Sequence, residues 1–538
     1  ADVVATILED YYAHTPAEAR RLGLHALDGV VPDRTETAIT DRARAIESDI
    51  DRLEQFSDAA LSEDERFDRD LLVSYLRAER VRLLTLRSTT TNPLFYADDV
   101  DLSPYILRDY APLVQRVAAI RRHATAIPAL LEQADRNLNS SLPRPALETA
   151  IGVFTETATF LRTDLRAVLD GGDIAGDTHE AVESAARALD AFVSQLNDRL
   201  PAATDAFAIG TESFRAMLEA GEMVDLPLAV ILEHGERDLE ANLERLRRTV
   251  DRIRPGADPR AVMAEMAERH PPAGELVPTA VAVLDDLRHF VVEHQIVDIP
   301  DGGACEVRET PGFLRWAFAM IDPAGPYEPV AAESFYYITP PETDWPAERR
   351  ESWLTNFDHA SLRCISAHEV YPGHYVHFLN LRANPSPVRK LALAYSFIEG
   401  WAHYAEQMMI EEGYGEGNPW IQLAQLKEAL IGDCRFIAAI KMHTAGMTLD
   451  EAILLFRDKA FADAEPAREE AVRGTFDPGY LNYTLGKLML GKLRDDVRQA
   501  DGDRFSLRAF HDRLLALGAP PFPLARRALL GPDAGPVL

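Results

Sequence analysis

The sequence contains few cysteines, and their positions predict no disulfide framework. Only three occur in 538 residues, at Cys305, Cys364 and Cys434, and no two of them form a C-x-x-C pair. This usage suits a reducing compartment or a large core. The first residues, ADVVATILEDYYAH, carry Asp and Glu where a signal peptide needs a basic start and an apolar run. We therefore expect a cytoplasmic protein, although a leader removed before Ala1 would leave no trace.

Long apolar runs and an excess of positive charge are also missing. No window reaches 18 uninterrupted apolar residues, so no membrane-spanning helix is predicted. The 87 acidic residues outnumber the 56 basic ones and give a formal net charge of −31. A surface of this charge repels nucleic-acid phosphates and anionic lipid headgroups, so we expect neither a nucleic acid nor a membrane as a partner.

Several motifs of other enzyme classes are absent. There is no G-x-G-x-x-G after a strand and no G-x-x-x-x-G-K-[ST], since Gly486-Lys487 is followed by Leu. There is also no G-x-S-x-G elbow. Binding of a dinucleotide or of a nucleotide phosphate, and hydrolysis by a serine on such an elbow, are therefore not supported.

Periodic apolar residues indicate a mainly α-helical protein. Apolar positions recur at three- and four-residue steps through the N-terminal half, and the same pattern runs from near Asp358 to about Leu530. Between them, residues 296–345 carry short β-prone runs that predict a small sheet. The predicted helices are 71–86, 111–134, 147–169, 179–200 and 226–250; the β-prone runs are IVDIP, CEVRET and SFYYITPP; the stretch 340–353 is expected to be irregular.

The histidines gather in the C-terminal half. Six of the fifteen fall between His359 and His443, centred on A-H-E-V-Y-P-G-H-Y-V-H, residues 367–377. Glu399 follows His374 after 25 residues. Imidazole and carboxylate groups bind Zn²⁺, and three protein ligands with one open position are typical of a catalytic site. The order His-Glu, His, distant Glu is that of zinc peptidases in which the Glu beside the first His is the general base.

The spacing of His368 and His374 requires an interrupted helix. Six residues correspond to about 240° on an unbroken helix, which would prevent the two rings from sharing a metal. Pro372 removes a helix hydrogen bond and Gly373 tolerates unusual dihedrals, so we predict a break between the histidines. The alternative is that Pro-Gly simply ends a helix and the histidines are scattered.

Two other histidines are candidates for the same site. His377 stands three residues after His374, so the two form a rival ligand pair that would leave the His368-Glu369 pair without a role. His403 lies on the helix face of Glu399 and either supports a ligand or is a polar residue beside the site.

The segments HEVYPGH, EGWAHYAE and PGYLNYTLGKL resemble the bacterial family called domain of unknown function 885, which carries H-E-x-x-P-G-H and is grouped with zinc metallopeptidases. The resemblance covers roughly residues 310–530 and extends to ESFYYITPPE and the C-terminal segment 504–530. It implies that His368, His374 and Glu399 bind one Zn²⁺ and that Glu369 is the base. Members often carry Gln at the position of His377, which argues against that residue as a ligand. They also carry an acid near 438–440, where this chain has Ala-Ala-Ile.

Hydrolysis also needs an oxyanion donor and a group that holds the substrate. Tyr483 is the first candidate donor, with Tyr480 next and His443 as the other. Tyr483 is almost as well explained as a core tyrosine whose hydroxyl is satisfied. Three basic residues could bind a substrate carboxylate: Arg435, Lys487 and Arg473. The alternative for each is a structural ion pair with one of the chain's own acids. SFYYITPP, with Tyr337 as a substrate contact, is either an edge strand for an extended peptide or a buried structural strand.

We therefore expect a mainly α-helical, zinc oligopeptidase-like protein with a deep cleft and a small β-sheet beside the metal site. A helical region, residues 1–295, and a catalytic region, residues 296–538, form one continuous unit. The expected activity is hydrolysis of peptide or related amide bonds in short substrates, by a dipeptidase, carboxypeptidase or oligopeptidase. The alternatives are hydrolysis of a non-peptide amide in a small metabolite and a non-catalytic helical metal-binding protein.

Overall fold

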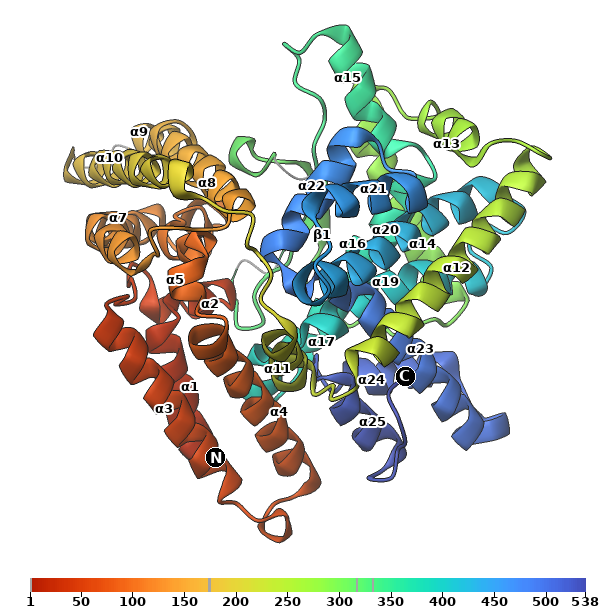
Figure 1. The fold of residues 1–538 in the computed structure, drawn as a ribbon, viewed down its shortest axis with the longest axis horizontal. Coiled ribbons are helices and arrows are strands. Elements are labelled where there is room, and N and C mark those ends of the chain that lie inside the picture. Colours follow the sequence, from red (N-terminus) through yellow and green to blue (C-terminus); the bar gives the residue numbers. More distant parts are fainter. Residues whose placement is uncertain (1, 173–175, 316–317, 331–332) are drawn as a thin grey trace. The chain divides into compact units, whose positions relative to one another are not determined.

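The computed structural model describes residues 2–172, 176–315, 318–330 and 333–538, and helices dominate this part of the chain (Figure 1). The mainly α-helical fold with a small sheet, predicted from the sequence, is confirmed. The deep cleft and the zinc oligopeptidase-like architecture stay predictions. Within the described residues, each helix is too short or too polar to span a lipid bilayer.

The chain divides into two compact units. Unit 1 consists of residues 1–209 and 324–332, and unit 2 consists of residues 210–323 and 333–538. The change of pattern seen in the sequence at residue 296 therefore falls inside unit 2, between its first helices and its sheet. All the residues predicted to act on a metal or a substrate belong to unit 2.

Unit 1 is built from amphipathic helices with local start signals. In the helix of Glu63–Arg80, for example, Ser62 and Glu65 form a capping box that satisfies the first free N–H groups. The predicted helix 147–169 is divided at Thr163, and the predicted 71–86 begins earlier, at Glu63, and ends in a π turn. The helices of unit 1 are α1 (Asp2–His14), α2 (Pro16–Arg21), α3 (Glu36–Glu54), α4 (Glu63–Arg80), α5 (Ser88–Thr91), α6 (Pro104–Leu107), α7 (Leu113–Asn137), α8 (Arg144–Arg162), α9 (Asp164–Gly171) and α10 (Gly176–Arg199).

A short segment from the middle of the chain, residues 324–330, packs with the first helices of unit 1. The N–H of Tyr327 donates to the carbonyl of Leu22 at 2.9 Å, and the carboxylate of Glu328 lies 2.7 Å from His25 Nε2. Burial lowers the pKa of His25, but its contacts with Asp28 and Glu328 outweigh burial and raise that pKa to about 9. A protonated His25 therefore pairs with the buried carboxylate of Glu328.

Unit 2 surrounds one helix, Pro419–Thr444, whose side chains are largely buried, polar ones such as Asp433 and His443 included, as expected for the centre of a large core. Gly400 and Gly486 face each other where two further helices cross, and a Cβ on Gly400 would lie 2.5 Å from the Gly486 Cα. The helices of unit 2 are α11 (Thr211–Glu222), α12 (Leu228–Ile253), α13 (Pro259–Ala267), α14 (Leu276–Glu293), α15 (Ala347–Leu354), α16 (Ser361–Glu369), α17 (His374–Ala383), α18 (Pro387–Leu391), α19 (Tyr395–Glu411), α20 (Pro419–Thr444), α21 (Leu449–Lys459), α22 (Ala464–Phe476), α23 (Asn482–Asp501), α24 (Leu507–Leu515) and α25 (Phe522–Leu530).

The sheet has three strands in the order β1-β3-β2: β1 (Cys305–Glu309), β2 (Ala319–Asp322) and β3 (Ser334–Ile338). β1 pairs parallel to β3, and β2 pairs antiparallel to it. Of the two alternatives for SFYYITPP, the buried structural strand is the one found, because β3 has a partner on each side and so cannot offer an edge. Its five residues are all buried, as in a central strand.

Two further details of the predicted sheet region are corrected. The run IVDIP is not a strand: the Ile296 N–H donates to Val291 at the end of α14, and the Ile296 carbonyl accepts from His511 Nδ1 at 2.7 Å. The backbone groups of Ile296 are thus satisfied by helices and not by a ladder. The stretch 340–353, expected to be irregular, contains most of α15.

Candidate metal centre

The helix that carries His368 is interrupted before His374, as predicted. α16 ends at Glu369, α17 begins at His374, and the turn between them contains a cis Tyr371–Pro372 peptide. The Gly373 N–H donates to the carbonyl of Ala367 at 3.0 Å. A Cβ at position 373 would lie 1.7 Å from the His368 carbonyl oxygen, so only glycine allows this close approach.

Trp401 in α19 holds the turn in place. Its ring is fully buried, and its Nε1–H donates to the carbonyls of Pro372 and Gly373 at 3.0 and 3.2 Å. α19 is itself fixed at its first turn by Glu222 of α11, whose carboxylate accepts from the N–H and the hydroxyl of Ser396. The elements on both sides of the site are thus positioned by buried hydrogen bonds.

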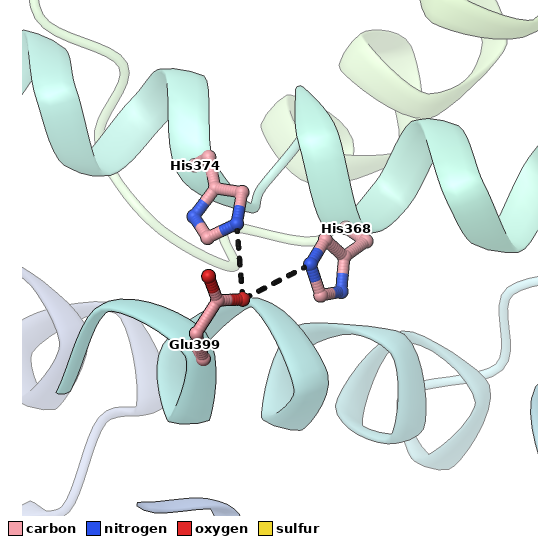
Figure 2. A group of neighbouring side chains, drawn as sticks. All are labelled: His368, His374 and Glu399. Atoms are coloured by element: carbon pink, nitrogen blue, oxygen red, sulfur yellow. Dashed lines mark ion pairs between the residues drawn. The ribbon is translucent and has the colours of Figure 1, made fainter. Parts of the chain in front are cut away.

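The turn and α19 bring the three predicted ligands together (Figure 2). Glu399 Oε2 lies 3.6 Å from His368 Nε2 and 3.5 Å from His374 Nε2. All three ligand atoms lie within 4.8 Å of one another. Glu399 Oε2 is buried and makes no hydrogen bond within the described residues, and burying a carboxylate oxygen without a hydrogen bond is costly.

These distances fit a shared metal ion better than direct hydrogen bonds. Two donor atoms bound to one tetrahedral Zn²⁺ at about 2.0–2.2 Å lie roughly 3.3–3.6 Å apart. Hydrogen bonds between imidazole and carboxylate would bring the atoms to about 2.7–2.9 Å. The set of two imidazole nitrogens and one carboxylate oxygen also matches the ligands that zinc accepts in catalytic sites. His368, His374 and Glu399 are therefore the residues that would hold a metal.

A second carboxylate, which the sequence did not single out, orients His368. Glu406 Oε1 lies 2.7 Å from His368 Nδ1 and 3.3 Å from His403 Nδ1. Because a carboxylate only accepts, His368 Nδ1 carries the proton and Nε2 is left to face the cluster. His403 thus takes the supporting position that the sequence had left open, by contact with Glu406 and not with the ligand atoms.

Electrostatics in the cluster favour a positive charge at its centre. Burial raises the pKa of Glu399 and of Glu406, but the neighbouring imidazoles outweigh it, so the pKa of Glu399 falls well below its usual range and that of Glu406 falls to about 2. Burial lowers the pKa of His368, yet Glu399 and Glu406 raise it well above its usual value. The two carboxylates therefore stay ionised and attract positive charge to the cluster, either a proton on an imidazole or a cation.

Glu369, the predicted base, faces the edge of the sheet. Its Oε2 accepts a hydrogen bond of 3.1 Å from the backbone N–H of Ile321 in β2. From β3, the Tyr336 hydroxyl lies 3.1 Å from Ser366 Oγ in α16. Because neighbouring side chains of a strand point to opposite faces, Tyr337, the predicted substrate contact, lies on the face away from Ser366. The residue of β3 that contacts the site helix is therefore Tyr336.

Two tyrosines lie beside the cluster. The rings of Tyr483 and His368 are nearly parallel, with their centroids 6.4 Å apart. The Tyr395 ring lies edge-on to that of Tyr483, with their centroids 6.1 Å apart. Arg473 donates to the Tyr395 hydroxyl at 2.9 Å and to the Tyr483 hydroxyl at 3.5 Å, and it also pairs with Asp477. Burial and then Glu399 raise the pKa of Tyr483, so its hydroxyl keeps its proton and can donate.

The other predicted site residues have partners within the chain. Arg435 binds Glu470 through two hydrogen bonds of 2.7 and 2.6 Å, and Lys487 binds Asp238 at 2.5 Å. Neither is therefore a free clamp for a substrate carboxylate; Arg435 instead supports Tyr483, with its guanidinium 4.7 Å from the ring centre. The side chain of Arg473 is one-third exposed, so Arg473 stays a candidate contact for a substrate carboxylate.

Three further candidates are held by the core. His443 Nε2 donates to the Gly474 carbonyl at 2.8 Å, and its ring packs against Phe214. Tyr480 is fully buried. The His377 ring lies among aromatic side chains, with Nε2 directed to the Gly518 carbonyl at 3.3 Å. The rival pair of His374 and His377 thus does not converge on one point.

We predict that Gly373→Ala abolishes the metal site. The added methyl group would collide with the His368 carbonyl, so the turn must move and displace both histidines. Zinc affinity, measured by competition with a chelator, should fall at least about tenfold. Gly491→Ala in α23, where a Cβ meets no atom within 4 Å, is the matched control and should bind zinc normally. Equal affinity in both variants would contradict the assigned role of the turn.

We further predict that Glu406→Gln weakens zinc binding about 10- to 100-fold, the usual effect of losing a carboxylate that orients a ligating histidine. The amide keeps the shape but removes the charge that holds His368 Nδ1–H. Glu412→Gln, an exposed acid at the end of the same helix, should have no effect. Unchanged affinity in Glu406→Gln would show that His368 is oriented without this carboxylate.

Comparison with known proteins gives a family and a shared fold. A solved structure of a protein described as a lipoprotein of unknown function from Shewanella oneidensis is 24% identical, with a TM-score of 0.82 over 98% of this chain and 99% of that one. A protein described as a lipoprotein from Colwellia psychrerythraea is 14% identical, with a TM-score of 0.81 over 98% of each chain. A search of curated proteins found no match. The family model of bacterial proteins of unknown function called DUF885 matches residues 16–529, and the chain therefore belongs to this family.

Proposed function

We propose that the protein is a zinc-dependent hydrolase that cleaves peptide or related amide bonds in short substrates. The observation that carries the proposal is the convergence of two imidazole nitrogens on one carboxylate oxygen. His368 Nε2 and His374 Nε2 lie 3.6 and 3.5 Å from Glu399 Oε2, which is buried and makes no hydrogen bond within the described residues. A polar cluster of this kind is expensive to bury without an ion that it binds. The neighbouring Glu369 supports hydrolysis over storage of a metal, because a binding site needs no base.

The proposed reaction divides the chemistry between the metal and the chain. A bound Zn²⁺ would act as a Lewis acid and lower the pKa of water at its open position. Glu369 takes a proton from the water as its oxygen adds to the substrate carbonyl carbon. The same carboxyl then returns the proton to the nitrogen as the C–N bond breaks, which yields a carboxylic acid and an amine. Transfer of the acid's proton to the amine leaves a carboxylate and an ammonium group. The Ile321 N–H holds Glu369 at the edge of the sheet through both steps.

Tyr483 is the proposed donor to the oxyanion that develops on the carbonyl oxygen. It stands on α23, its ring faces that of His368, and Arg435 and Arg473 hold it in place. A donor aimed at developing charge is worth about 10²–10³ in turnover. Tyr395, joined to Tyr483 through Arg473, belongs to the same wall of the site.

The assignment of ligands predicts the metal content of three variants. Purified wild-type protein should hold about one zinc per chain by elemental analysis. His368→Ala and Glu399→Ala should lose it, because each removes one of three ligands. His377→Gln is the matched control, since that ring is directed away from the cluster, and it should keep the metal. Full occupancy in both ligand variants would refute the site.

The role of the base predicts a separation of binding from turnover. Glu369→Gln should keep its zinc and its fold but lose at least about 10²-fold in kcat on a mixed peptide library, which is the scale of a positioned base. Loss of zinc from this variant would make Glu369 a ligand. Unchanged turnover with intact zinc would assign the base to another residue.

Two observations bear on the location of the protein, and they point in opposite directions. Cysteine usage favours the cytoplasm. Both structural relatives are described as lipoproteins, which supports an exported form instead.

A further inference from the structure

β2 is an edge strand with main-chain groups that point away from the sheet. The Phe318 carbonyl accepts from the Thr339 N–H across the β2–β3 ladder, so the main-chain N–H and C=O of residue 318 point toward β3. Antiparallel pairing alternates between hydrogen-bonded and non-hydrogen-bonded pairs. The main-chain N–H and C=O groups of Ala319 and Ile321 therefore point away from β3, out of the sheet edge. These two residues lie opposite Ile338 and Tyr336. The bond from the Ile321 N–H to Glu369 confirms this alternation independently.

The outward groups of β2 lie at the reacting end of the site. Ile321 N–H reaches Glu369, which directly follows the ligand His368. In the part of the chain that the structure describes, the Ala319 N–H and the carbonyls of Ala319 and Ile321 have no partner assigned, and all four residues of β2 are partly exposed. Unpaired groups on an exposed edge form a template for another extended chain.

We propose that the outer edge of β2 binds the main chain of an extended peptide substrate, with substrate N–H groups donating to the carbonyls of Ala319 and Ile321 and a substrate carbonyl accepting from the Ala319 N–H. This inference rests on the proposed function and narrows it. A substrate that fills the edge needs at least two peptide N–H groups two residues apart. The substrate class is therefore an extended oligopeptide, and a small non-peptide amide is excluded.

The proposal also assigns specificity to the backbone and not to a charged clamp. Arg435 and Lys487 are already paired with Glu470 and Asp238. Main-chain pairing gives affinity that does not depend on the peptide's side chains, since these point to the two faces of the sheet and not into the ladder. The enzyme should accordingly accept many sequences that can lie extended.

The test measures peptide binding to the zinc-loaded Glu369→Gln variant, so that no peptide is consumed. The best binder from a peptide library is methylated at one backbone nitrogen at a time. Methylation removes a donor and separates the strands, so affinity should fall at least about tenfold at two positions that are two residues apart. The position between them should tolerate the methyl group, because its N–H points away from β2.

A protein variant tests the same edge from the other side. Ala319→Pro removes the outward N–H but no ladder bond, which edge strands tolerate, and should weaken binding about fivefold or more relative to Ala319→Val, which has similar bulk and keeps the N–H. Should Ala319→Pro fail to fold, the methylation series decides alone.

A methylation series without alternation, equal binding by the two Ala319 variants, or binding only of non-peptide amides would overturn the proposal. Absence of any peptide binding would overturn it as well. Failure of the proposed function is a different result, because it would appear as wild-type protein that holds no zinc and hydrolyses nothing, whatever the binding series shows.

Discussion

The candidate site depends on one close approach of the backbone, between residue 373 and the carbonyl of His368. A continuous helix would place His368 and His374 on different faces. The turn brings α17 back toward α16, and it can close only because Gly373 has no side chain. The adjacent cis Tyr371–Pro372 peptide belongs to the same turn. The positions of both imidazoles, and of Glu369 between them, follow from this local geometry.

α19 supplies most of what the turn needs on its other side. Within three turns of helix it presents the carboxylate that faces both imidazoles, the tryptophan that binds the turn, and the carboxylate that holds His368. It approaches α23 closely at Gly400 and Gly486, which brings Tyr483 against the His368 ring. The density of such residues explains why EGWAHYAE is a specific motif: nearly each of its positions has a contact that a substitution would lose.

Local chemistry made part of the site predictable from the sequence. The order of His368, Glu369, His374 and Glu399 and the break at Pro372-Gly373 depend on residue type and spacing, and the structure brings the three ligand candidates together. The mainly helical fold followed from periodicity in the same way. Two strands also followed, since the β-prone runs CEVRET and SFYYITPP contain β1 and β3. β2 did not, because it is only four residues long, and the fully buried SFYYI gives no alternation from which to tell Tyr336 from Tyr337.

What the sequence could not supply were contacts between distant segments. Glu406 is one of many acids, and only the packing of α19 on α16 identifies it as the partner of His368. Lys487 stood out as a cation in an apolar stretch, but its partner Asp238 lies 249 residues earlier in the chain. The same holds for Arg435 and Glu470. Whether a buried cation serves the fold or a ligand is decided by tertiary structure.

The path of the chain also bears on how the protein is made. Unit 1 contains residues 324–332, which the ribosome produces more than a hundred residues after α10 is complete. Until then Leu22 lacks the N–H of Tyr327 and His25 lacks the carboxylate of Glu328. The N-terminal helices therefore emerge with one part of their packing missing, and they can reach their final state only when α11–α14 and the first two strands have been synthesised.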